Sequence, residues 1–177
     1  MPAVSSSSPQ AQHLRDLIKD VKFAMLTTRA VDGTLTSRPM TTLQTEFNGT
    51  LWFMLAADSL KAMDVEERPK VNLSYAQPEE GRYVCVSGTA EVVRDRTKAR
   101  ELWSPLFETW FPAGPEDPNL ALLRVDIASA DYWESPHGDP QRLYEAMEKG
   151  DAGALGQQTH LEMIRTTTEQ SRSAGTC

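Results

Sequence analysis

The segment TLTSRPMTTLQT, residues 34–45, decides how the chain is predicted to fold. Its threonines suit a β-strand, because β-branched side chains pack well on a pleated surface. Pro39 lacks the N–H that a sheet ladder needs, so it belongs on an edge, at a bulge or at the end of a strand. Arg38 beside it is always charged, and burying such a group without a partner is costly. The segment therefore predicts a strand with interrupted pairing and a cation at the interruption.

Five more segments show strand patterns, and two tight turns connect the first three strands. Asp32 with Gly33, and Asn48 with Gly49, form residue pairs that suit the positive φ angles of a hairpin turn. The predicted strands cover residues 22–29, 34–45, 51–57, 70–77, 83–93 and 121–135. Antiparallel strands in this number close into a barrel or a sandwich. We therefore expect a mainly β fold of six antiparallel strands with short helices.

Four short helices are predicted around these strands, at residues 11–21, 59–67, 96–103 and 140–150. Ser59 and Asp95 can each accept a hydrogen bond from a backbone N–H at a helix start. Gly88 predicts a bulge or a close approach of two backbones. The last strand is expected to bend near Ala128 and Ser129.

The 177 residues suit one domain with tails at both ends. Residues 1–10 are rich in serine and proline and are predicted to be a disordered N-terminus. Residues 11–150 form the predicted domain. Residues 151–177 are rich in Gly, Gln and Thr and are predicted to be a flexible C-terminal tail.

The net charge of −7 argues against a nucleic-acid or membrane partner, since both favour a basic surface. Two cysteines, Cys85 and Cys177, and three scattered histidines provide no metal-ligand spacing, so no metal is expected. The N-terminus lacks the basic and apolar regions of a signal peptide. No apolar run approaches the roughly 20 residues of a membrane span. We expect a cytoplasmic protein.

Two basic residues can be brought together by a local argument. Arg38 lies in the second strand, and Lys61 lies in the first turn of the helix after the third strand. If the second and third strands pair as a hairpin, these segments are neighbours. With Ser59 and the free N–H groups of the helix start, they form a candidate phosphate site. The alternative is that Lys61 is solvated and that Arg38 pairs with an acidic residue.

Four tryptophans, Trp52, Trp103, Trp110 and Trp133, are many for this length. Trp52 lies in a strand that is apolar on both faces and is expected in the core. Trp110 lies in a loop rich in Pro and Gly, and an exposed apolar loop marks an interface or a ligand lid. Trp133 near the end of the last strand fits core or dimer packing and ring stacking on a ligand equally well.

Taken together, these segments resemble a known family. The motifs FAMLTT, SRPM, GTLWFM, VNLSYA, VSGTAE, ELWSP and YWESP occur in an order similar to that of the general stress protein 26 group. This group belongs to the pyridoxamine 5′-phosphate oxidase-like FMN-binding split-barrel proteins. The resemblance covers residues 14–142 and implies a six-stranded antiparallel split β-barrel. It also implies a homodimer with FMN at the subunit interface.

The resemblance further implies which residues bind the cofactor. Arg38 would reach the FMN phosphate, with Ser59 and Lys61 completing that site. The backbone near Pro39 would face the flavin ring, and the third strand would line the ribityl chain and ring. Trp133, or less directly Trp103, would cover the flavin from the partner chain. The full implied set is Ser37, Arg38, Pro39, Met40, Phe53, Met54, Leu55, Ser59, Lys61, Trp103 and Trp133.

The chain departs from the vitamin B6 oxidases in one segment. Where they carry an Arg-x-His-type grip on the substrate phosphate, this chain has QRLYEA, with Tyr144 near the histidine position. This argues against pyridoxamine 5′-phosphate oxidation. The open alternatives are an FMN-dependent oxidoreductase of unknown substrate and reductant, a flavin-binding or flavin-sensing protein without turnover, and the same barrel binding a deazaflavin or haem. No catalytic residue is evident.

Overall fold

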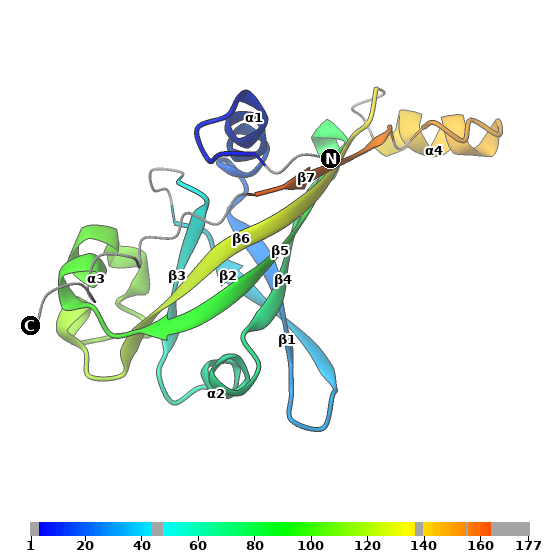
Figure 1. Ribbon diagram of the computed structural model, residues 1–177. Coiled ribbons are helices and arrows are strands. Elements are labelled where there is room, and N and C mark those ends of the chain that lie inside the picture. The colour runs from blue at the N-terminus through cyan, green and yellow to red at the C-terminus, as the bar shows by residue number, and fades with distance from the viewer. Residues whose placement is uncertain (1–3, 44–47, 137–139, 155, 164–177) are drawn as a thin grey trace, which may run out of the picture.

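The computed structural model describes residues 4–43, 48–136, 140–154 and 156–163 (Figure 1). It is mainly β, as predicted, with seven antiparallel strands and four α-helices among these residues. The strands are β1 (Phe23–Arg29), β2 (Leu35–Thr41), β3 (Thr50–Ala56), β4 (Lys70–Gln77), β5 (Arg82–Val93), β6 (Leu120–Glu134) and β7 (Gln158–Glu162). The helices are α1 (Pro9–Ile18), α2 (Leu60–Glu67), α3 (Arg96–Leu102) and α4 (Pro140–Glu148), with short 3₁₀ turns η1 (Pro78–Glu80), η2 (Pro105–Phe107) and η3 (Gly114–Glu116).

The strands form one strongly curved sheet in the order β2-β1-β4-β5-β6-β3, with β7 beside β6. Figure 1 shows the sheet curling into a half-barrel. β2 and β3 lie at its two ends and approach each other, but no ladder joins them in the described part of the chain. We call the space between these two strands the open seam. It is the split of the predicted split barrel.

This arrangement corrects the prediction that the second and third strands pair as a hairpin. β3 pairs with β6 instead, with Thr50 opposite Asp126 and Ala56 opposite Leu120. The physical reason is that β3 is apolar on both faces. Beside β6 it buries Phe53 in the barrel core and Met54 in a second cluster under α3.

Local turn and bulge signals are confirmed. Gly33 turns the β1–β2 hairpin with a φ of 91°. The β5–β6 ladder shifts register at Gly88, where Ala128 is the extra residue in β6. A Cβ atom on Gly88 would lie 2.6 Å from the Asp126 carbonyl oxygen, so only glycine allows this close approach.

The main core fills the barrel interior, and the first two helices close its two ends (Figure 1). α1 contributes Leu14 and Ile18, and α2 contributes Val65. Ser59 and Asp95 are the N-caps of α2 and α3, as predicted. A helix therefore covers each barrel end, and the open seam lies between β2 and β3.

Two segments predicted to lack regular structure are in part ordered. β7 pairs along β6 within the predicted C-terminal tail, because Leu161 buries its side chain in the core. At the other end, α1 begins at Pro9 with Ser8 as its N-cap, and the Val4 N–H donates to the Glu162 carbonyl. Residues 1–3 and 164–177 of the two predicted tails lie outside the described residues.

Within the described residues, no helix is both long and apolar enough to cross a membrane.

Candidate functional site

Arg38 points to the inner side of the sheet, toward the barrel end that α2 closes. Because side chains alternate along a strand, it shares this face of β2 with the buried Met40. Its Nη1 donates to Thr28 Oγ1 at 2.8 Å, and its Nη2 lies 3.4 Å from Asp64 Oδ2. Thr28 Oγ1 also donates to Asp64 Oδ2 at 2.9 Å. A half-buried guanidinium is therefore held between a strand hydroxyl and a helix carboxylate.

Asp64 was not singled out from the sequence, although pairing of Arg38 with an acidic residue was the stated alternative. The structure realises that alternative, since the two side chains form an ion pair. Helical spacing is the sequence pattern that could have identified Asp64. Asp64 lies three residues after Lys61 on the same short helix, so the two side chains share one face.

Lys61 lies in the first turn of α2 and is half-buried. Burial lowers the pKa of Lys61 from its ordinary value, and the positive charge of Arg38 lowers it further. Among the described residues, no carboxylate lies within ion-pair distance of the Lys61 ammonium. The site thus holds two cations that repel each other, and among the described residues only Arg38 has a carboxylate partner, Asp64.

Ser59 completes the start of α2. Its Oγ donates to the Ala56 carbonyl at 2.6 Å and accepts from the Ala62 N–H at 3.4 Å. The remaining N–H groups of the first turn and the positive end of the helix dipole favour an anion here. Arg38, Ser59 and Lys61 are therefore gathered at one end of the barrel.

Arg38 lies near Lys61 as predicted, but the reason given for it is wrong. The prediction relied on hairpin pairing of the second and third strands, which the structure lacks in its described part. Arg38 instead reaches α2 over Thr28 of β1, and α2 packs against that strand. The contact depends on how the sheet curls.

The other predicted residues of β2 and β3 divide between two faces. Ser37 and Pro39 are exposed on the outer face of β2, where Ser37 Oγ lies 2.7 Å from Thr27 Oγ1. Met40 points inward. Phe53, Met54 and Leu55 of β3 are all buried, so their side chains are engaged in packing.

Trp103 and Trp133 lie away from Arg38 within one chain. Trp103 follows α3 and packs against Phe107 at 6.1 Å between ring centroids. Trp133 is half-buried near the end of β6, paired with Tyr83. This end of β6 is opposite to the end that pairs with β3 and leads to α2, so Trp133 is not part of the Arg38 site of its own chain.

Comparison with known proteins identifies the family. The sequence model of the family described as pyridoxamine 5′-phosphate oxidase like matches residues 9–153. The chain belongs to this family. The resemblance inferred from the sequence motifs is thereby confirmed, and so is the split-barrel fold class.

Several relatives extend this result. Protein bli-3 from Neurospora crassa is 34% identical over 137 residues, covering 70% of this chain and 66% of its own length, a little under two thirds. A structure from Jannaschia sp. CCS1, assigned to general stress protein 26, has 27% identity and a TM-score of 0.67, covering 87% of this chain and 98% of that one. The general stress FMN/FAD binding protein from Xanthomonas citri has 27% identity and a TM-score of 0.61, covering 70% and 87%.

The Lys61 ammonium is expected to titrate below the ordinary lysine pKa of 10.5, because burial and Arg38 disfavour its charged form. NMR titration of labelled lysine side chains measures this directly. A Lys61 pKa at or above 10.5 would contradict the crowding of two cations.

The same shift has a consequence for stability. Below the folded-state pKa, Lys61 is charged at a cost that the unfolded chain does not have, and this cost disappears as pH rises toward 10.5. At neutral pH, Lys61→Met should therefore not lower the free energy of unfolding. Lys19→Met is the matched control for a lysine that has a carboxylate partner, because Lys19 forms a 3.0 Å ion pair with Asp16.

Proposed function

We propose that this protein is an FMN-binding flavoprotein that holds the cofactor phosphate with Lys61, Arg38 and the start of α2. The observation that carries the proposal is the pair of half-buried cations, of which only Arg38 has a carboxylate partner among the described residues. A phosphate dianion at this point would relieve the repulsion and accept from the helix N–H groups. The residues present therefore fit the phosphate end of FMN.

The FMN/FAD-binding relative from Xanthomonas citri supports a flavin cofactor. The preference for FMN follows from charge. The terminal phosphate of FMN is a dianion, whereas the bridging phosphates of FAD each carry a single charge. Two cations at a helix start match the terminal group better.

The open seam supports the placement of the flavin ring. Among the described strands, β2 has a neighbour only on the β1 side, so the backbone groups of its other edge have no strand partner. Pro39 fits such an edge strand. These free N–H and C=O groups can bond the polar edge of the isoalloxazine, which would lie along the seam from the phosphate.

We also propose that a second copy of the chain covers the outer face of the sheet. Phe23, Met25 and Leu35 are 63%, 42% and 69% exposed and lie with Pro39 on the outer face of β1 and β2. Trp133 lies on the same face, farther along the sheet. In a two-fold dimer the same patch serves both subunits. Such a dimer can bring Trp133 of the partner subunit over the flavin near Pro39.

The proposed role is an oxidoreductase or a flavin sensor of unknown substrate. FMN, when bound, would supply electron transfer. This chain would bind the phosphate and orient the ring along the seam. The second copy, packed on the outer face of the sheet, would exclude water from the ring. Tyr144, which stands near the histidine position of the vitamin B6 oxidases, lies exposed on α4. This supports a substrate other than pyridoxamine 5′-phosphate.

FMN and riboflavin differ only in the phosphate, so comparing them isolates the proposed site. Arg38→Ala should weaken FMN binding on the order of 2–5 kcal/mol, because a charged hydrogen-bond partner of the phosphate is lost. Lys61→Met should weaken FMN binding about tenfold. Neither change should alter riboflavin affinity as strongly, as measured by flavin fluorescence titration.

Arg100→Ala is the control, because Arg100 is an exposed arginine on α3, outside both the phosphate site and the proposed dimer face. It should leave both affinities unchanged. Equal losses for FMN and riboflavin in the Arg38 and Lys61 variants would show that these residues do not hold the phosphate.

Introducing a charged side chain on the outer face tests the proposed dimer. Met25→Asp should convert dimer to monomer in analytical ultracentrifugation, because an aspartate buried at an apolar interface has no partner. Leu106→Asp, at an exposed apolar residue on η2, is the control and should leave the dimer intact. A Met25→Asp protein that stays dimeric would place the interface elsewhere.

A further inference from the structure

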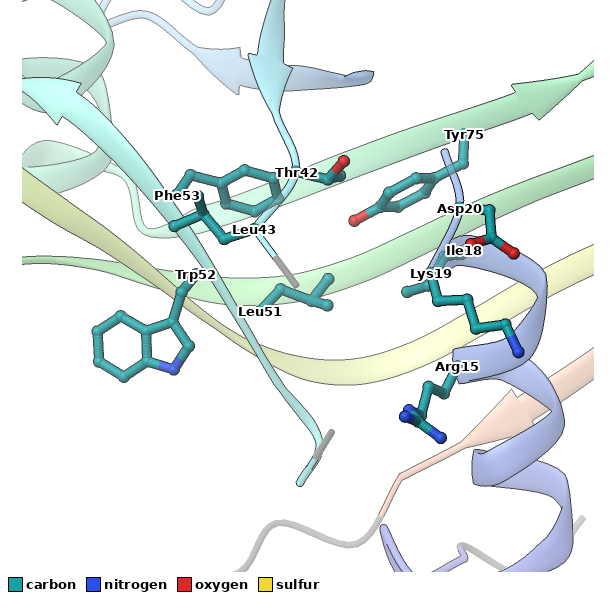
Figure 2. A pocket seen from close by; sticks show the side chains of 10 residues that line it. All are labelled: Arg15, Ile18, Lys19, Asp20, Thr42, Leu43, Leu51, Trp52, Phe53 and Tyr75. Carbon is teal, nitrogen blue, oxygen red and sulfur yellow. The ribbon is translucent and has the colours of Figure 1, made fainter. Parts of the chain in front are cut away.

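A cavity of about 180 Å³ opens at the barrel end that α1 covers. Figure 2 shows it between α1 on one side and the beginning of β3 on the other. Its apolar walls include Ile18 from α1, Leu43 after the end of β2, and Leu51 and Phe53 from β3. The cavity therefore lies at the α1 end of the open seam, and the Arg38 and Lys61 cations lie at the α2 end.

Tyr75 of β4 contributes the buried polar group of the cavity wall. Its side chain is only 3% exposed, and its hydroxyl has no hydrogen-bond partner among the residues that the structure describes. Figure 2 shows the hydroxyl directed into the cavity. Burial raises the pKa of Tyr75 far above its ordinary value, so the phenol stays protonated and is a hydrogen-bond donor.

A buried hydroxyl without a partner destabilises a fold, and most such groups are paired. Here a phenylalanine would have filled the same space without that cost. We propose that this cavity binds a neutral, single-ring aromatic carbonyl compound whose carbonyl oxygen accepts a hydrogen bond from the Tyr75 hydroxyl.

Size and charge define this ligand class. A cavity of about 150 Å³ lined by apolar side chains accepts benzene, so about 180 Å³ suits one ring with a small carbonyl substituent. The charged lining is mixed, with Arg15 and Lys19 beside Asp20. Lys19 is also paired with Asp16 at 3.0 Å. The lining therefore provides little net attraction for an ion and favours a neutral ligand.

The cavity residues are distinct from those of the proposed phosphate site. α1 and α2 close opposite ends of the barrel (Figure 1), and none of the cavity residues is Arg38, Ser59 or Lys61. Phe53 is the one wall residue that also belongs to the predicted cofactor set. Because the flavin ring is proposed to lie along the same seam, binding at the cavity is measured first on the flavin-free protein.

Acetophenone and ethylbenzene are the probes, because they share a ring and nearly the same shape but only acetophenone has a carbonyl. NMR titration of the Ile18 and Leu51 methyl resonances gives both affinities and locates the binding. The wild-type protein should bind acetophenone about three- to tenfold more tightly than ethylbenzene. Equal affinities, or no binding of either probe, would overturn the proposal.

Tyr75→Phe keeps the ring and removes the donor. In this variant the two probes should bind equally, with ethylbenzene affinity unchanged from the wild type. Tyr144→Phe, at an exposed tyrosine on α4, is the matched control and should keep the preference for acetophenone. A preference that survives in Tyr75→Phe would show that Tyr75 does not recognise the carbonyl.

A competition experiment separates the cavity from the flavin site. Saturating FMN should leave the acetophenone affinity unchanged if the flavin ring bonds the free edge of β2 without reaching Leu43 and Leu51 at the α1 end of the seam. Displacement of acetophenone by FMN would show that the cavity holds part of the flavin, and would overturn a separate ligand site.

Discussion

The pairing of β3 with β6 instead of β2 is the constraint on which the rest of the structure depends. β3 is apolar on both faces, and beside β6 it is covered by the barrel core on one face and by the α3 cluster on the other. β2 is then left with one neighbour. The barrel is open at the seam as a result, and both the cation site and the cavity lie along it.

The open seam also accounts for Pro39 and Arg38 in β2. Pro39 is tolerated because β2 is an edge strand, and Arg38 is tolerated because Thr28 and Asp64 meet its guanidinium. Lys61 nearby has no such carboxylate in the described structure, and burial together with the charge of Arg38 lowers its pKa. A site that is electrostatically unfavourable when empty is one that gains most from an anion.

Features that depend only on residues adjacent in the sequence could be predicted. The turn at Gly33, the bulge at Gly88 and the Ser59 cap each follow from a few adjacent positions. The partners of β3 and Arg38 could not, because they lie far along the chain and are set by the sheet's curl. β7 was missed because five residues in a polar segment give a weak periodic signal, and its pairing is decided by the exposed edge of β6.

The central claim is that this barrel binds FMN, and a visible absorption spectrum tests it most directly. The purified protein would be mixed with FMN, desalted and compared with free FMN. We expect a retained flavin band that is shifted from that of the free cofactor, because the ring would leave water for the seam. A folded protein that retains no flavin band after desalting would contradict the assignment.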